Sequence, residues 1–221
     1  MPETRTVIYT LVDLFHYLES GRIAVPNFQR GYVWGKEQVR QLFVSINSGY
    51  PIGTLMAVEA EENRFEAMPA ERSLFPSPVQ IPEDRYRLWV IDGAQRLAAL
   101  YNGLFSARES FGILYDLRRK DFYFSEEARS AAPLLKMTSL FSSRELMSLQ
   151  AGLANTPDGE VLLAELNGIR ERFYSYSIPL VVIAGLDDFE VVDIFARINS
   201  TGTQLTKKEI ALAKKRTSRK R

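Results

Sequence analysis

The sequence predicts an α/β (α+β) fold, in which short strands alternate with amphipathic helices. Apolar residues recur at the spacing of one helix face in several segments, for example at Val39, Leu42, Phe43 and Ile46. Short runs of β-branched and apolar residues, such as Ser177–Ile183, lie between these segments. With 221 residues, the chain is long enough for one domain, or for one domain with a small helical lobe.

Composition excludes several kinds of site. The chain has no cysteine, which excludes disulfides, thiolate metal sites and cysteine nucleophiles. Its single histidine, His16, excludes a histidine-rich metal site and a His-Asn-His nuclease centre. The formal net charge of +1 does not by itself indicate a nucleic-acid partner. Because there is no signal peptide and no apolar run of the roughly 18 residues that a membrane span needs, we expect a cytoplasmic protein without membrane contact.

In the first half of the chain, the patterns place strands between helices. The expected strands are Thr4–Tyr9 at a sheet edge, Arg22–Val25, Thr54–Glu59 with Asn63–Ala67 as its hairpin partner, and Arg85–Ile91. The expected helices are one that begins after Thr10, with Asp13 completing a capping box, a second over Lys36–Ser48, and a third after Gly93. The proline-rich segment 69–82 shows little periodicity, so we expect a surface excursion there.

The second half is expected to be richer in helix. Phe111–Asp116 and Asp121–Phe124 are expected to form a hairpin with a basic tip, followed by helices over Ser142–Leu149 and Gly159–Phe173. A strand over Ser177–Ile183, a helix through Val191 and Ile198, and a final helix opened by Thr206 and Glu209 complete the chain.

The segment Val90–Leu100 carries the first candidate site. An apolar strand ends at Asp92, Gly93 allows a sharp turn, and a helix begins directly afterwards. The first N–H groups of a helix have no partner within it, and the helix dipole adds positive potential there, so this geometry suits a phosphate. Gln95 and Arg96 lie on the first helical turn, beside those donors. The alternative is structural: Asp92 caps the helix and Arg96 pairs with a surface carboxylate.

The segment Pro26–Trp34 carries a second polar pair, Gln29-Arg30, between aromatic residues. Aromatic side chains anchored in the core would hold Gln29 and Arg30 rigidly on a loop. The alternative is a surface loop with aromatic anchors and a solvated polar pair. A third polar segment, Arg197–Gly202, contains Asn199 and follows an apolar helix face.

Together these segments suit a polyphosphate ligand. Arginine binds phosphate oxygens through two parallel hydrogen bonds and stays charged at physiological pH. Asp92 could hold Mg²⁺ or orient a water nucleophile, and Asn199 could support a ribose, a base or the metal. The sequence GxxxxGK[ST] is absent, which excludes an ordinary P-loop NTPase.

Four segments also carry a family resemblance. They are Phe28–Trp34 (FQRGYVW), Ser48–Gly53 (SGYPIG), Ile91–Leu97 (IDGAQRL) and Phe195–Thr206 (FARINSTGTQLT). In this order they resemble the N-terminal domain of GmrSD-type, or type IV, restriction systems, a family related to the ParB/sulfiredoxin superfamily.

The resemblance implies a ParB/sulfiredoxin-like mixed-sheet core with flanking helices. The core would occupy residues 1–125, and a helical extension 126–221 would return one strand, 177–183, to complete it. The resemblance also implies nucleoside triphosphate binding and Mg²⁺-dependent hydrolysis, coupled to the cutting of modified foreign DNA in phage defence. The nucleotide-binding positions would be Gln29, Arg30, Gly93, Arg96 and Asn199. The catalytic positions would be Asp92, Gln95 and Arg96, and Asp92 would be the Mg²⁺ ligand.

The chain departs from this family in two ways. The family usually has Asp-Gly-Gln-Gln-Arg, whereas Ala94 stands here in place of the first glutamine. If that amide positions the phosphates or the water, hydrolysis would be weakened while binding survives. The family's nuclease is commonly a C-terminal His-Asn-His domain, so we expect that activity in a further domain or partner subunit.

Three functional readings follow. The first is an NTPase that regulates a restriction system, with DNA and a nuclease as partners. The second is a non-catalytic module that binds DNA or protein in a nucleotide-dependent manner, as a ParB-like clamp. For DNA, the basic tail, including Lys214, Lys215 and Arg216, would contact phosphates; alternatively the tail is a solvated end. The third, a sulfiredoxin-like reductase, needs a cysteine that the chain lacks.

Overall fold

The computed structural model describes residues 2–76, 86–106, 111–128 and 133–200, with side chains described as far as Ile198. The chain divides into two compact units. The first unit combines Met1–Val33, Gly53–Gln95 and Ser177–Arg221, and the second combines Trp34–Ile52 and Arg96–Tyr176. The sequence prediction used two continuous segments, 1–125 and 126–221, whereas each compact unit is assembled from segments that are separated along the chain.

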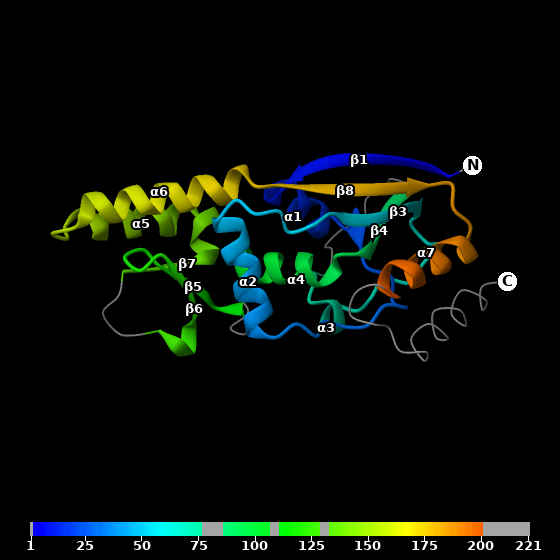
Figure 1. Ribbon diagram of the computed structural model, residues 1–221, viewed down its shortest axis with the longest axis horizontal. Helices are drawn as coiled ribbons and strands as arrows, with labels where there is room; N and C mark the ends of the chain where they lie inside the picture. The colour runs from blue at the N-terminus through cyan, green and yellow to red at the C-terminus, as the bar shows by residue number, and fades with distance from the viewer. Residues whose placement is uncertain (1, 77–85, 107–110, 129–132, 201–221) are drawn as a thin grey trace. The chain divides into compact units, whose positions relative to one another are not determined.

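The first unit is built on a five-stranded mixed sheet (Figure 1). Its strands, in spatial order, are β1 (Glu3–Thr10), β8 (Ser177–Ala184), β3 (Leu55–Glu61), β4 (Tyr86–Asp92) and β2 (Ile23–Ala24). The pairs β1–β8 and β3–β4 are antiparallel, and the pairs β8–β3 and β4–β2 are parallel. The α+β class, the mixed sheet, the edge position of β1 and the returning strand are therefore confirmed.

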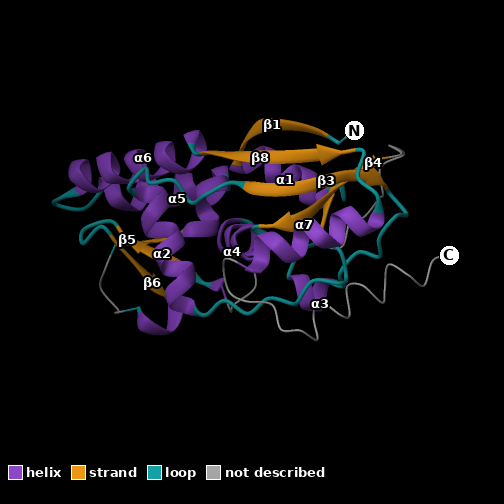
Figure 2. Cartoon of the chain, turned by 45° about the vertical axis from the view of Figure 1, so that its right-hand side comes forward, coloured by secondary structure: helices purple, strands orange, loops and turns teal. Residues whose placement is uncertain are grey.

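Among the described residues of the first unit, the helices are α1 (Leu11–Glu19), α3 (Ala70–Ser73) and α7 (Asp188–Ser200), together with the start of α4. The capping box at α1 is present, because the Thr10 hydroxyl accepts from the Asp13 N–H while the Asp13 carboxylate accepts from the Thr10 N–H. Helix α7 packs against β4, as Figure 2 shows. Its residues Val191 and Phe195 are buried in one apolar cluster with Trp89 of β4.

The second unit surrounds an aromatic core with helices and a small sheet. Its helices are α2 (Lys36–Asn47), α4 (Ala94–Leu104, whose first two residues belong to the first unit), α5 (Ser143–Ala154) and α6 (Gly159–Ser175). Its antiparallel sheet has the order β6 (Asp121–Phe124), β5 (Ile113–Asp116), β7 (Leu134–Lys136). The Phe43 ring of α2 lies 5.8 Å from Phe122 and 5.7 Å from Phe173, so the core joins α2, β6 and α6.

Two predictions about the first unit are wrong. Asn63–Ala67 forms no hairpin with β3, whose two edges are already occupied by β4 and β8; Ala67 instead bridges Pro26. The segment after Pro69 is not a surface excursion over residues 69–76, because Ser73 and Phe75 are buried there. Residues 77–85 lie outside the described part of the chain. Strand β7 had no counterpart in the prediction.

Among the described helices, none is long and apolar enough to cross a membrane.

Candidate functional site

The segment around Asp92 has the predicted strand–turn–helix geometry. Strand β4 ends at Asp92, Gly93 adopts a left-handed φ of +88°, and α4 begins at Ala94. Glycine suits this turn because a side chain would be strained at that φ. Opposite the end of β4, Met56 pairs with Asp92 while Ala57 pairs with Val90, so Ile91 is an extra residue and β4 bulges. A bulge re-aims the side chains that follow it, and here it directly precedes Asp92.

Gln29 is brought to the same place. Its side chain is 8% exposed, and its Nε2 donates to the Val90 carbonyl oxygen at 2.5 Å, two residues before Asp92. The neighbouring Phe28 ring is buried, at 5.7 Å from Phe65 and 5.3 Å from Phe195. The aromatic anchor expected for this loop is therefore confirmed at Phe28, and the loop is fixed beside the end of β4.

Gln95 ties the other end of this loop to α4. Its Oε1 accepts from the Val33 N–H at 2.9 Å, and its Nε2 donates to the Gly31 carbonyl oxygen at 3.2 Å. Both ends of this amide are thus engaged with backbone groups of the loop. This geometry gives Gln95 a role in positioning the loop, while its predicted role in catalysis stays a prediction.

Sheet topology explains why these segments meet. Strands β2 and β4 are parallel neighbours, with Ile23 paired to Leu88 and Ala24 to Trp89. Their carboxyl ends therefore lie at one edge of the sheet, where the Pro26–Val33 loop follows β2 and the Asp92–Gly93 turn follows β4. The crevice beyond such carboxyl ends is where open α/β sheets bind ligands.

Arg30 lies between the anchored residues of the loop and is half-buried. Within the described part of the chain, its guanidinium forms no hydrogen bond or ion pair. The ring of the nearby Tyr32 is partly buried, and this burial raises the pKa of its hydroxyl, so Tyr32 stays neutral at physiological pH. The loop therefore presents the Arg30 charge without a compensating carboxylate among the described residues.

Arg72 of α3 holds the same loop. Its Nη1 donates to Asn27 Oδ1 at 2.8 Å, its Nη2 donates to the Gln29 carbonyl oxygen at 3.1 Å, and its own carbonyl oxygen accepts from the Tyr32 N–H at 2.8 Å. Sequence reasoning missed Arg72, because a helix of four residues is too short to show a periodic pattern.

Arg96 belongs to the second unit. It is half-buried, and its Nη1 donates to the Ile52 carbonyl oxygen at 2.6 Å. The Tyr176 hydroxyl, whose pKa is raised by burial, accepts from the Ile52 N–H and donates to the Tyr50 carbonyl oxygen. One arginine donor is therefore used to hold the Tyr50–Ile52 segment. The role of Arg96 in binding phosphate stays a prediction.

Asn199 lies in the last turn of α7, and its side chain is outside the described part of the structure. The preceding residue, Ile198, packs against the apolar cluster that contains Phe28 and Ile91. The end of α7 is therefore packed against the core of the first unit.

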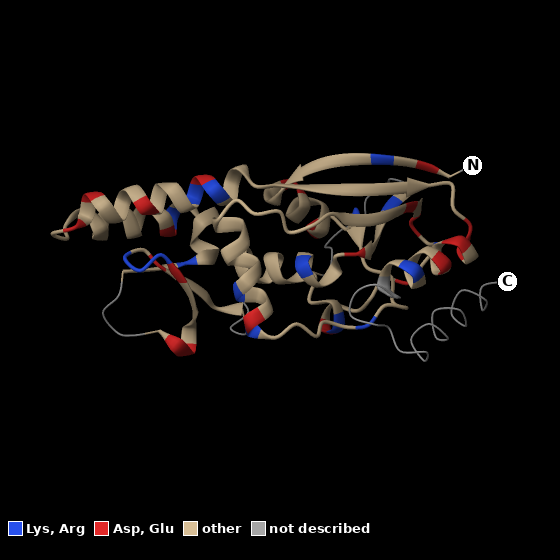
Figure 3. Cartoon of the chain, viewed as in Figure 1, with Lys and Arg blue, Asp and Glu red and all other residues tan. Residues whose placement is uncertain are grey.

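Figure 3 shows acidic residues at the start of α7 and an arginine near its end, which complements the helix dipole. The candidate DNA contacts Lys214, Lys215 and Arg216 lie outside the described residues.

No cluster of three or more metal-ligating side chains occurs among the described residues. Asp92 is the carboxylate at the end of β4 and is half-buried. One carboxylate fits Mg²⁺, since this ion usually takes one or two carboxylates and completes its shell with water and substrate phosphates.

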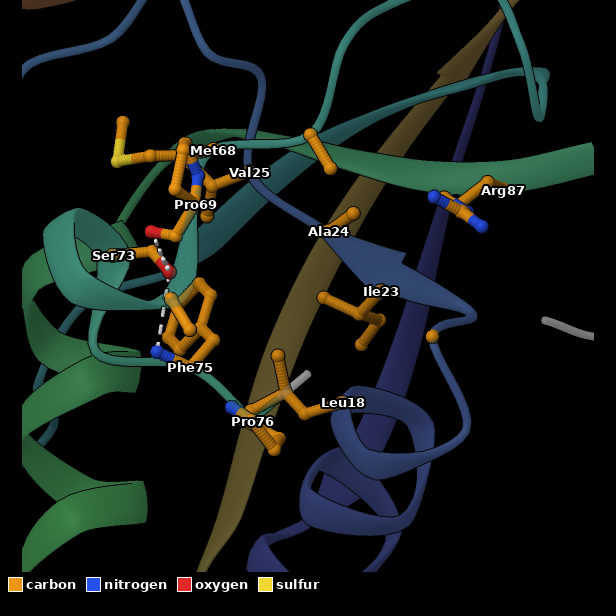
Figure 4. Close-up of a pocket in the computed structure, with 13 residues that line it drawn as sticks. Leu18, Ile23, Ala24, Val25, Met68, Pro69, Ser73, Phe75, Pro76 and Arg87 are labelled. Atoms are coloured by element: carbon orange, nitrogen blue, oxygen red, sulfur yellow. Dashed lines mark hydrogen bonds between the residues drawn. The ribbon is translucent and has the colours of Figure 1, made fainter. Parts of the chain in front are cut away.

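A separate cavity of about 240 Å³ lies between β2, the end of α1 and α3 (Figure 4). Its walls are mainly apolar and include Ile23, Met68 and Phe75. The Ser73 hydroxyl inside it donates to the Pro69 carbonyl oxygen and accepts from the Phe75 N–H, so both of its partners flank α3. None of the predicted site residues lines this cavity.

Comparison with known proteins agrees with the resemblance of the four motifs. Residues 11–214 match the family described as "GmrSD restriction endonuclease, N-terminal domain". The chain is also 24% identical, over 92% of its length, to a protein from Methanocaldococcus jannaschii named "Uncharacterized protein MJ0686". It spans 41% of that relative's length. Because the family match covers most of the sequence and includes all four motifs, the chain belongs to the family of GmrSD restriction endonuclease N-terminal domains.

Proposed function

We propose that this domain binds a nucleoside triphosphate with Mg²⁺ and hydrolyses it, as the regulatory part of a restriction system that acts on modified foreign DNA. The observation that carries the proposal is the hydrogen bond from Gln29 to the Val90 carbonyl oxygen. It joins the loop of Arg30 to the strand that ends at Asp92, so a cation and a carboxylate are held at one edge of the sheet.

The roles follow from this arrangement. The Arg30 guanidinium binds phosphate oxygens, and the N–H groups at the start of α4 add donors beside Gly93. Asp92 holds Mg²⁺ through its carboxylate or through water, and the ion, when bound, neutralises developing charge on the phosphates. Gln29 and Gln95 keep the loop and the turn in place. Asn199 contacts the nucleotide from α7, and Arg96 contributes a further guanidinium.

The restriction role rests on the family. Foreign DNA is the target, and a nuclease domain or subunit performs the cut, because a chain with one histidine, His16, cannot supply a His-Asn-His centre. The domain acts in the cytoplasm, where both DNA and nucleotide are available.

The test is phosphate release from each of the four NTPs with Mg²⁺, for the wild-type chain and Asp92→Ala. We expect turnover in the wild type and a loss of at least about a hundredfold in the variant, because a phosphoryl-transfer site depends on its metal carboxylate. Asp121→Ala, which removes an exposed carboxylate from β6, is the control and should keep wild-type turnover. Turnover that is equal in wild type and Asp92→Ala would contradict this assignment.

A second candidate function is a non-catalytic module that uses the nucleotide as a switch for binding DNA or protein. Two observations favour it. Both ends of the Gln95 side-chain amide are hydrogen-bonded to the loop, and Ala94 has no amide that could orient a water molecule. Nucleotide binding without phosphate release would support this alternative. In that case Ala94→Gln is the variant in which we expect hydrolysis to appear.

A further inference from the structure

We propose that Arg72, a residue outside all four family motifs, is the positioning residue that holds the Arg30 loop in its phosphate-binding conformation. The identity of the ligand rests on the proposed nucleotide function. The claim that Arg72 orders the loop does not depend on that function. Arg72 comes from α3, which is separated from the loop in the sequence by α2, β3 and about forty residues.

Arg72 contacts the loop at three positions, before and after Arg30. The guanidinium reaches Asn27 and the Gln29 carbonyl oxygen, and the Arg72 carbonyl oxygen receives the Tyr32 N–H. The residue that these contacts bracket is Arg30. Arg72 therefore fixes the backbone on both sides of Arg30 and leaves the Arg30 side chain to meet a ligand.

Gly31 shows how closely α3 approaches the loop. A Cβ built on Gly31 would lie 3.1 Å from the Arg72 carbonyl oxygen, a distance that leaves little room for any side chain. Gly31 thus suits the close approach of the two backbones, because a side chain there would be in tight contact with the Arg72 carbonyl oxygen. Residue Arg72 and the loop are therefore joined in three ways: by hydrogen bonds from the guanidinium, by a backbone hydrogen bond and by a tight van der Waals contact at Gly31.

A lysine at position 72 would keep the positive charge but could not replace the two hydrogen bonds of the Arg72 guanidinium. Guanidinium presents several N–H groups in a fixed plane, so Arg72 can serve Asn27 and Gln29 at once, whereas an ammonium is a single point of charge. Asn27 is itself held, because its Nδ2 donates to Glu66 Oε2 at 3.3 Å. A loop that is ordered before the ligand arrives loses less conformational freedom on binding, which raises affinity.

The first experiment measures backbone amide hydrogen exchange over residues 27–33 in the full chain, without ligand. We expect Arg72→Gln to raise exchange in this segment and Arg72→Lys to raise it as well. Arg5→Gln is the matched control, because the Arg5 guanidinium also makes two hydrogen bonds, to the half-buried Glu59, on the five-stranded sheet and away from the loop. Unchanged exchange in Arg72→Gln would overturn the inference, whether or not any nucleotide binds.

The second experiment is a double-mutant cycle on binding of the nucleotide that the wild type prefers, in non-hydrolysable form with Mg²⁺. Arg72→Gln should weaken binding by about tenfold, because a loop that is no longer ordered beforehand loses more conformational freedom on binding. In the Arg30→Gln background, Arg72→Gln should have no further effect, since Arg72 acts through Arg30.

The outcomes separate the two proposals. Additive losses would mean that Arg72 contributes independently of Arg30, which contradicts a positioning role. Wild-type affinity in Arg72→Gln would contradict it too. If the wild type binds no nucleotide, the proposed function fails, and the exchange experiment alone then decides whether Arg72 orders the loop.

Discussion

Two glutamine amides, those of Gln29 and Gln95, connect the Arg30 loop to its neighbours. Gln95 satisfies the Val33 N–H and the Gly31 carbonyl oxygen of the loop, and Gln29 reaches from the loop to the Val90 carbonyl oxygen of β4. Gln29 is the more buried of the two and serves the Val90 carbonyl oxygen inside the unit. A neutral amide suits this position, because burying a carboxylate or an ammonium without a partner would cost far more.

We expect Gln29→Leu to destabilise the chain by about 1–3 kcal/mol, because the Val90 carbonyl oxygen loses a buried donor. Urea denaturation followed by circular dichroism measures the change. The control is Gln41→Leu, at an exposed position on α2, which should stay within about 0.5 kcal/mol of wild type. Equal stability of the wild type and Gln29→Leu would mean that the hydrogen bond to Val90 makes no net contribution to the free energy of unfolding.

At the scale of elements, the second unit depends on a buried carboxylate on α6. Glu165 accepts from the Tyr115 hydroxyl of β5 at 2.8 Å and pairs with Arg172 and Lys120 at 2.7 Å each. Burial opposes its ionisation, but the hydrogen bonds from Lys120, Tyr115 and Arg172 outweigh burial and lower its pKa. Burial, reinforced by Glu165, raises the pKa of Tyr115 to about 12. Arg172 also donates to Asn47, so this network links α2, β5 and α6.

The lowered pKa of Glu165 makes the stability of the chain sensitive to acid. Its contribution is fully present above the ordinary glutamate value of 4.5 and is lost as pH falls below that value through the lowered pKa. We therefore expect the free energy of unfolding to fall more steeply below pH 4.5 in the wild type than in Glu165→Gln. Denaturant titrations at several pH values measure this slope. Glu171→Gln, at an exposed position on the same helix, should keep the wild-type slope; a wild-type slope in Glu165→Gln would refute the prediction.

At the scale of the whole molecule, chain order and spatial order differ. Strand β8 comes from the last fifth of the sequence, yet it lies between β1 and β3. It pairs with β1 along the full length of that strand, from Glu3 opposite Ala184 to Thr10 opposite Ser177. Contacts between such distant segments form only after a large loop has closed, and the sheet of the first unit combines strands from the start and from the last fifth of the sequence.

A fragment of residues 1–125 tests this dependence. We expect it to show no cooperative unfolding transition, because β1 loses its whole partner strand and β3 loses one of its two neighbours. A fragment of residues 1–200 keeps every described strand and helix and is the control. Thermal unfolding followed by circular dichroism compares the two. A cooperative transition in 1–125 would mean that this segment forms a core without strand β8.

Local features of the fold were predictable from the sequence because neighbouring residues determine them. The capping box of Thr10 and Asp13, the turn at Gly93 and the helix over Lys36–Asn47 all depend on residues within a few positions of one another. The family was predictable because four short motifs keep their order. The strand Ser177–Ala184 was predictable as a strand, since its β-branched residues favour extended backbone.

The partners of these elements were decided only by the tertiary structure. Asn63–Ala67 looked like the hairpin partner of β3, but β4 and β8 occupy both edges of that strand. Arg72 had no pattern to mark it, because its contacts with Asn27 and Gln29 span more than forty residues. The sequence by itself thus determined the elements, the motifs and the family. Only the packed fold decided which strands are neighbours and which side chains hold the Arg30 loop, because long-range pairing depends on the shape and burial of the whole unit.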